Sequence, residues 1–244
     1  MKRGPMLDRI VDVSPRSRAR LAGAIALITT TSGFSVFVRG KLVDLNDAAV
    51  TAHNILANEL LFRFAILGDV IALLYIAYSL LLYDVFRPVN RSISLLAAFF
   101  SLVGCATSAV LCLLEDAPLV ILKSAPSAPG FTAEQLQVLA LAFLKLHSEG
   151  YTISMVLFGS YNLLIGYLVL QSTFLPRILG LLLGLSGVCY LFNSFAYFLS
   201  PAFAAHLLPY ILIPGASELL FALWLVVFGM NVQRWNALAE TRAA

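Results

Sequence analysis

The sequence is poor in charge. Only 12% of its 244 residues are Asp, Glu, Lys or Arg, whereas 60% are hydrophobic. Soluble domains usually contain about one quarter charged residues and about one half apolar residues. With so few charged side chains, the chain cannot cover the surface of a water-soluble globule of this size. The composition therefore excludes a soluble globular protein and indicates a protein whose apolar surface faces lipid.

Charge is also missing from long, continuous runs of the chain. A helix needs roughly 20 apolar residues to cross a bilayer, and six runs approach that length. Lipid gives the backbone no hydrogen-bond partners, so these runs must be helices, and they lack the alternation of barrel strands. The sequence predicts an all-α membrane protein, a six transmembrane helix bundle within residues 19–233. The predicted helices span about 19–39, 60–85, 93–114, 149–170, 177–200 and 207–231.

Positive charge is unevenly distributed among the segments outside these runs. The N-terminal segment 1–18 is basic, and the C-terminal tail 234–244 carries two arginines. The linkers after the second and fourth helices add Arg87, Arg91 and Arg177. Lys and Arg stay on the cytoplasmic side, so we expect a multi-pass protein of the bacterial inner membrane with both termini in the cytoplasm. The first run lacks an obvious small-x-small cleavage site, so we expect it to be a retained helix.

Several common functional signals are absent. The net charge is +3 and the basic residues do not gather on a soluble domain, so nothing indicates a nucleic-acid partner. The three cysteines lie inside predicted helices without metal-site spacing. His147 and Glu149 point about 200° apart around a helix and cannot reach one ion. No HExxH, GxSxG or glycine-rich phosphate loop occurs. The sequence therefore predicts no metal and no cofactor, and it leaves open whether the protein is an enzyme.

The first predicted outer linker contains an amphipathic segment. Asn46 or Asp47 can cap a helix with an apolar face that runs on into the second span. We expect this segment to lie against the outer leaflet. It would either cover a cavity or act as a simple interfacial anchor, and both interpretations stay open.

The second predicted outer linker contains a similar segment. Pro118 and later prolines are expected to interrupt the chain after the third span. Thr132 and Gln135 then form a capping-box pattern, which predicts a second amphipathic helix up to about His147. This helix too is expected to lie against the outer leaflet before the fourth span begins.

A few polar residues are predicted to lie deep in the membrane, where each is costly unless it has a partner or a function. Asp69 and Glu218 are the carboxylates inside the predicted spans. His147 and Tyr151 share one face of the fourth helix, and Asn193 lies in the outer half of the fifth. These groups predict an outward-facing polar pocket, although hydrogen bonds that only hold the helices together would also account for them. The pocket candidates are Asp69, His147, Tyr151, Asn193, Glu218 and Arg63.

Two local features accompany this pocket. Arg63 follows Glu59 by four residues, which favours an ion pair on the helix surface, or alternatively a contact with an anionic lipid headgroup. Pro214 falls inside the sixth predicted helix, where it is expected to kink the helix and leave the carbonyl of Tyr210 without a partner.

Two stretches resemble a known family. Residues 86–104 (FRPVNRSISLLAAFFSLVG) and 146–180 (LHSEGYTISMVLFGSYNLLIGYLVLQSTFLPRILG) are similar to bacterial membrane proteins grouped as domain of unknown function family 4386. The resemblance extends from about residue 18 to 236. Its most specific parts are the LH-x-x-GY segment, with His147 and Tyr151, and the LPR-x-LG turn. The resemblance implies a multi-helix bacterial integral membrane protein and supplies no activity.

Three functions are compatible with these observations. The protein binds a small molecule, ion or lipid headgroup in the polar pocket. Alternatively, it is a membrane-embedded enzyme acting on a lipid or isoprenoid-like substrate, with His147 as acid or base. A non-catalytic structural subunit is the third alternative. The lipid bilayer is the expected partner in each case, a small-molecule or lipid ligand belongs to the first two, and a homo-oligomer is left open.

Overall fold

The computed structural model describes residues 14–124, 130–207 and 212–241. All regular secondary structure in these ranges is helical. Five stretches are long and apolar enough to cross a bilayer, namely Pro15–Leu42, Glu59–Phe86, Arg91–Lys123, Ala133–Gln171 and Arg177–Leu199. The pair Pro214–Val227 and Val232–Thr241 adds a sixth if it is counted as one span, although it bends by 96°. The predicted all-α membrane fold is confirmed.

The chain divides into two compact units. Unit 1 comprises Met1–Leu27, Ile76–Leu102 and Phe158–Ala244, and unit 2 comprises Ile28–Tyr75 and Val103–Leu157. The two longest helices, α7 (Arg91–Lys123) and α8 (Ala133–Gln171), are divided between the units, and two further helices cross the boundary by one or two residues at one end. Each unit has polar residues of its own, so each is described by itself.

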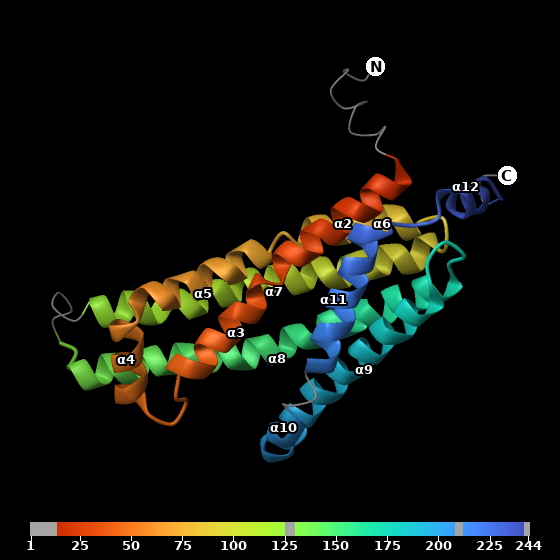
Figure 1. The fold of residues 1–244 in the computed structure, drawn as a ribbon. Coiled ribbons are helices and arrows are strands. Elements are labelled where there is room, and N and C mark those ends of the chain that lie inside the picture. The colour runs from red at the N-terminus through yellow and green to blue at the C-terminus, as the bar shows by residue number, and fades with distance from the viewer. Residues whose placement is uncertain (1–13, 125–129, 208–211, 242–244) are drawn as a thin grey trace, which may run out of the picture. The chain divides into compact units, whose positions relative to one another are not determined.

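Unit 2 is built around α3 (Thr31–Leu42), α4 (Ala48–Ala57) and α5 (Glu59–Ala72). Helices α3 and α5 lie against each other (Figure 1). Parts of α7 and α8 complete the unit. Its core is apolar and consists of Val38, Leu42, Ala52, Ile55, Phe62, Ala65, Leu119, Leu122, Ala140 and Leu144. Burial of these side chains away from water and lipid supplies the packing that positions the polar residues described below.

Unit 1 contains most of α2 (Pro15–Thr29) and α6 (Tyr75–Phe86), together with α9 (Arg177–Leu199), α10 (Pro201–Leu207), α11 (Leu212–Val227) and α12 (Val232–Thr241). Helices α10 and α11 both pack against α9. Glycines bring α8 and α9 close together within this unit, because a Cβ on Gly187 would lie 2.6 Å from the carbonyl oxygen of Gly159. Small residues permit such close backbone approach in membranes.

Helix α12 ends the described chain and is fixed to unit 1 by polar contacts. The Trp235 indole N–H donates to the carbonyl of Val85 at 2.8 Å, and Arg234 donates to the carbonyl of Thr173 at 3.0 Å. Its ten residues contain no buried side chain. The bend between α11 and α12 falls at Gly229, whose φ of 66° is in the region that glycine adopts without strain.

The predicted interruption at Pro118 is wrong. Helix α7 continues through Pro118 as far as Lys123. A proline inside a helix removes one backbone hydrogen bond, but Leu119, the next residue, and Leu122, one turn of helix beyond the proline, are buried in the core of unit 2. We infer that the packing of these leucines outweighs the lost bond. The third helix is therefore much longer than predicted.

The second outer segment is not a separate helix. The predicted capping box is confirmed, since the Gln135 amide N–H donates to Thr132 Oγ1 at 3.2 Å and the Thr132 amide N–H donates to Gln135 Oε1 at 2.9 Å. Helix α8 then runs without a break through His147 to Gln171. The stretch 133–171 contains no proline, and its three glycines, Gly150, Gly159 and Gly166, are tolerated inside the helix.

The first outer segment behaves largely as predicted. Asp47 is the cap of α4, because its Oδ1 accepts from the amide of Val50 at 2.9 Å. The helix does not run on into the second span, however. It ends at Ala57, and α5 begins separately at Glu59 after Asn58.

Pro214 lies in α11, whose first described residue is Leu212. Tyr210, whose carbonyl was expected to lose its partner, lies outside the described residues. The predicted kink at Pro214 therefore stays a prediction.

Candidate functional site

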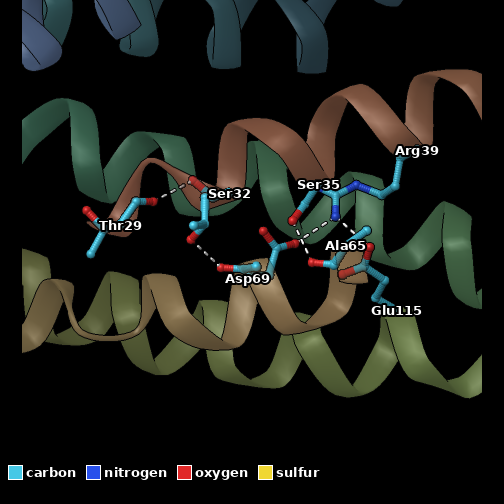
Figure 2. Close-up of polar contacts among 9 residues, drawn as sticks. Thr29, Ser32, Ser35, Arg39, Ala65, Asp69 and Glu115 are labelled. Atoms are coloured by element: carbon cyan, nitrogen blue, oxygen red, sulfur yellow. Dashed lines mark hydrogen bonds and ion pairs between the residues drawn. The ribbon is translucent and has the colours of Figure 1, made fainter. Parts of the chain in front are cut away.

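Arg39 of α3 lies between two carboxylates of unit 2 (Figure 2). Its Nη1 donates to Asp69 Oδ2 of α5 at 2.7 Å and to Glu115 Oε1 of α7 at 2.6 Å. The Arg39 side chain extends back along α3, which is the direction in which Cα–Cβ bonds of a helix tilt. One guanidinium therefore joins three helices.

Small residues bring α3 and α5 together beside this contact. Ser35 donates to the carbonyl of Ala65 at 2.5 Å, and Thr31 donates to the carbonyl of Gly68 at 2.9 Å. A Cβ on Gly68 would lie 2.9 Å from the Thr31 carbonyl oxygen, so a larger residue would separate the helices. These contacts fix the position of Asp69, the next residue on α5, relative to Arg39.

The three charged side chains are removed from solvent and from other polar groups to different degrees. Arg39 and Asp69 are 14% and 16% exposed, and Glu115 is fully buried. Glu115 Oε2 has no hydrogen-bond partner among the described residues. A buried oxygen without a partner costs about 1–3 kcal/mol, and more when it carries charge. An arrangement selected only for stability would be expected to satisfy this oxygen.

His147 of α8 completes the group. Its side chain is 5% exposed. One ring nitrogen of His147 and one carboxylate oxygen each of Asp69 and Glu115 lie within 4.8 Å of one another. We call Arg39, Asp69, Glu115 and His147 the ionisable cluster.

The ionisable cluster has more acidic than basic groups. It contains two carboxyl groups and one guanidinium, so its net charge is −1 when both carboxyl groups are ionised and His147 is neutral. Charges are strongly penalised in a medium of low dielectric constant unless they are balanced. The cluster therefore attracts a cation or a proton donor, and it presents one buried oxygen and one buried ring nitrogen to receive it.

A second polar group lies in unit 1. Asn162 Nδ2 donates to Glu218 Oε1 at 2.6 Å and to Ser186 Oγ at 3.2 Å, and the Ser186 hydroxyl lies 3.4 Å from Glu218 Oε1. Asn162 and Ser186 are buried. Here the carboxylate is held by neutral donors from two other helices, an arrangement typical of polar contacts between transmembrane helices.

The predicted pocket residues are distributed over both units. Asp69 and His147 are brought together in the ionisable cluster, whereas Glu218 belongs to the polar group of unit 1. Tyr151 lies in unit 2 with 39% of its surface exposed, and Asn193 lies partly buried on α9 in unit 1. A single pocket that combines all of them stays a prediction.

Arg63 does not join the ionisable cluster. Its Nε donates to Glu59 Oε1 at 2.8 Å, so the predicted ion pair on the helix surface is confirmed. Lys123 of α7 reaches the same oxygen at 2.6 Å. The Arg63 and Lys123 side chains are about half exposed. Screening by solvent makes such exposed pairs weak.

The sequence interpretation missed Arg39 and Glu115. Arg39 is the last residue of the predicted helix 19–39, and Glu115 directly follows the predicted helix 93–114. A signal was nevertheless present, because Glu115 and Asp116 are followed by the apolar stretch 117–122. A helix that continues through this stretch carries Glu115 into the interior of unit 2.

A cavity of about 640 Å³ lies elsewhere, in unit 1. It is formed by the turn between α8 and α9 and by the bend between α11 and α12, and its lining includes Arg16, Phe174, Trp224 and Arg234. None of the predicted pocket residues lines it. The Arg16 guanidinium donates to the carbonyl of Phe228 at 3.3 Å, so this arginine caps the end of α11.

Comparison with known proteins identifies relatives without a described activity. A family model described as domain of unknown function (DUF4386) matches residues 21–229. An uncharacterised protein of Archaeoglobus fulgidus is 27% identical over 163 residues, which are 66% of this chain and 81% of the relative. No solved structure matches. The residues matched by the family model include all four residues of the ionisable cluster.

Proposed function

The chain belongs to the DUF4386 family, and we propose that it is a membrane-embedded binding protein that holds a small cationic or polar ligand at the ionisable cluster. The observation that carries this proposal is Glu115 Oε2, a fully buried carboxylate oxygen without a partner among the described residues, in a cluster with two carboxyl groups and one guanidinium. A ligand that donates hydrogen bonds or carries positive charge would satisfy both deficits.

A purely structural role explains the cluster less well. Buried ion pairs rarely stabilise a protein more than apolar residues of the same size, because desolvation offsets the attraction between the charges. Polar contacts between helices would suffice to hold the bundle together, as the neutral donors around Glu218 illustrate. Two carboxylates against one guanidinium is a costly way to pack three helices, and this supports a binding role.

We further propose that the cluster opens to the outer side of the membrane. The basic segments predict cytoplasmic termini, which places Arg91 and Gln171 at the cytoplasmic ends of α7 and α8. Glu115 comes 24 residues after Arg91, and His147 comes 24 residues before Gln171. At 1.5 Å per residue, each distance is about 36 Å along the helix. Because the hydrocarbon core is about 30 Å thick, moderately tilted helices would carry both residues to its outer boundary.

Mass spectrometry of the intact protein tests the binding function. The full chain would be extracted gently from its native membrane and compared with Glu115→Gln and Asp69→Asn. We expect an adduct on the wild type that is lost in both variants, because each removes a charge from the cluster. Glu218→Gln is the matched control, since it neutralises a carboxylate of unit 1, and it should keep the adduct.

Two results would contradict the proposal. One is a wild-type protein that carries nothing except lipids common to all the variants. The other is an adduct that survives both Glu115→Gln and Asp69→Asn. Accessibility to the outer side is checked separately by adding candidate ligands to sealed, right-side-out vesicles, where binding should not require disruption of the membrane.

A further inference from the structure

We propose that the ligand of the ionisable cluster is a divalent transition-metal ion, bound by Glu115 Oε2, a carboxylate oxygen of Asp69 and a ring nitrogen of His147. This inference rests on the binding function proposed above and specifies its ligand. Arg39 would remain in place, on the carboxylate oxygens that the metal does not use.

The spacing of the three side chains suits one ion. One carboxylate oxygen each of Asp69 and Glu115 and one ring nitrogen of His147 lie within 4.8 Å of one another. Nitrogen and oxygen ligands lie about 2.0–2.2 Å from an ion such as Zn²⁺, so two ligands of the same ion are about 3–4 Å apart. Because 4.8 Å exceeds this ligand spacing by roughly 1 Å, metal binding would require the three side chains to move slightly closer together.

One of the donors has no other partner among the described residues. Glu115 Oε2 is fully buried and accepts no hydrogen bond. Burying a polar group without a partner is unfavourable. The carboxylate of Asp69 and the buried His147 ring lie beside the Glu115 carboxylate. A metal ion would give Glu115 Oε2 a partner and bind all three side chains.

Arg39 is compatible with an ion in this position. It binds Glu115 Oε1 and Asp69 Oδ2, and each carboxylate has a second oxygen. Hydrogen bonds from an outer group to the ligating carboxylates are common around protein metal sites, where they orient the ligands. The guanidinium also repels a dication. Binding would change the net charge of the cluster from −1 to +1, so the site should exchange its ion rather than retain it permanently.

The mixed donor set narrows the choice of metal. Imidazole together with carboxylates is typical of sites for Zn²⁺, Fe²⁺, Mn²⁺ or Co²⁺. Mg²⁺ and Ca²⁺ prefer oxygen ligands alone, and Cu⁺ prefers thiolates and thioethers. Three protein ligands leave at least one coordination position open, which a water molecule or a second ligand could fill.

Titration of the purified full-length protein with Co²⁺ tests the inference, because bound Co²⁺ has a visible ligand-field absorption that reports its ligands. The protein should carry an affinity tag without histidines. We expect saturation at one equivalent of Co²⁺, and Zn²⁺ should displace it. His147→Gln and Glu115→Gln should each weaken binding at least 10-fold. His53→Gln and Glu218→Gln are matched controls that should leave the titration unchanged.

A thermal measurement guards against variants that merely fail to fold. In Arg39→Gln the two carboxylates lose their cation, so the metal-free variant should melt at a lower temperature than the wild type. Added Zn²⁺ should recover most of that loss by supplying the missing charge. A structural ion pair alone would show the loss without recovery.

The outcomes separate this inference from the proposed function. Absence of saturable Co²⁺ binding by the wild type, or binding that His147→Gln leaves unchanged, would overturn the metal assignment. If metal binding is absent while Glu115→Gln still abolishes another adduct in the mass spectrum, the inference fails and the binding function stands. If neither metal nor another adduct depends on the cluster, both fail.

Discussion

Arg39 contacts two carboxylates from two other helices, and one of these, on Glu115, is fully buried. Arg63 and Lys123 share the carboxylate of Glu59 in a similar way, but at the surface. The two arrangements differ in burial and in composition, because the buried one has two carboxylates for one cation and the exposed one has two cations for one carboxylate. They therefore form a comparison inside one molecule between a buried charge network and an exposed one.

Replacing Arg39 by Gln should destabilise the metal-free protein by about 3–5 kcal/mol, because it leaves two carboxylates without their cation in a medium of low dielectric constant. Arg63→Gln is the matched control and should change stability little, since its ion pair is half exposed. Thermal unfolding in detergent, followed by circular dichroism, measures the difference. Equal melting temperatures for the two variants would mean that the Arg39 contacts do not stabilise the fold.

Part of the cluster could be predicted from the sequence. Asp69 and His147 were identified because polar residues inside apolar runs are costly and need an explanation. Arg39 and Glu115 were missed because a charge near the end of a run is usually at the membrane surface. Whether it is buried depends on how far the helix continues, and this is decided by residues such as Leu119 and Leu122 that pack beyond it.

Helices α8 and α9 approach closely at their glycines. A Cβ on Gly187 would lie 2.6 Å from the Gly159 carbonyl oxygen and 2.7 Å from Leu163 Cγ, whereas a Cβ on Gly184 would meet nothing within 4 Å. Both glycines lie on α9, one turn of helix apart. The same substitution at the two positions therefore tests the contact between the helices separately from helix propensity.

Gly187→Ala should lower the melting temperature, because one of the two helices must shift to make room for the methyl group. Gly184→Ala should leave it unchanged or raise it slightly, since Ala favours a helix by about 1 kcal/mol over Gly in water. Differential scanning calorimetry of the two purified variants measures both melting temperatures. A Gly187→Ala protein as stable as the wild type would show that α8 and α9 are not held at the close approach described.

Element boundaries were less predictable than element type. The apolar runs predicted helices correctly, and the capping pattern at Thr132 predicted where α8 begins. The positions where helices end were predicted less well, since Pro118 was taken as a stop although α7 passes through it. A local rule gives the free energy that one residue such as Pro118 costs a helix. Whether the helix continues depends also on how well the side chains of the following turn pack.

At the scale of the whole molecule, the distribution of basic residues predicts a topology that accessibility can test. In a background without cysteines, Asp44→Cys between α3 and α4 should react with a membrane-impermeant maleimide added to intact cells. Glu240→Cys in α12 should react only after the membrane is opened. The expectation follows from the basic segments remaining in the cytoplasm. Reaction of Glu240→Cys in intact cells would reverse the proposed orientation and place the ionisable cluster on the cytoplasmic side.

The division of the chain into two units was not predictable from the sequence. Apolar runs show which segments enter the membrane but not which of their faces meet, because lipid-facing and protein-facing residues are similarly apolar. The sequence interpretation therefore pooled Asp69 and Glu218 in one pocket. In the structure they belong to different units, each with its own polar partners.

The fluorescence of the two tryptophans of the chain can show whether binding in unit 2 affects unit 1. Trp224 stacks on Phe228 with ring centroids 4.4 Å apart, and Trp235 donates to the carbonyl of Val85. Both belong to unit 1, whereas the ionisable cluster belongs to unit 2. A ligand at the cluster has no tryptophan in its own unit to quench. A change of intrinsic emission on ligand addition that Glu115→Gln abolishes would therefore be an effect of binding in unit 2 that is observed in unit 1.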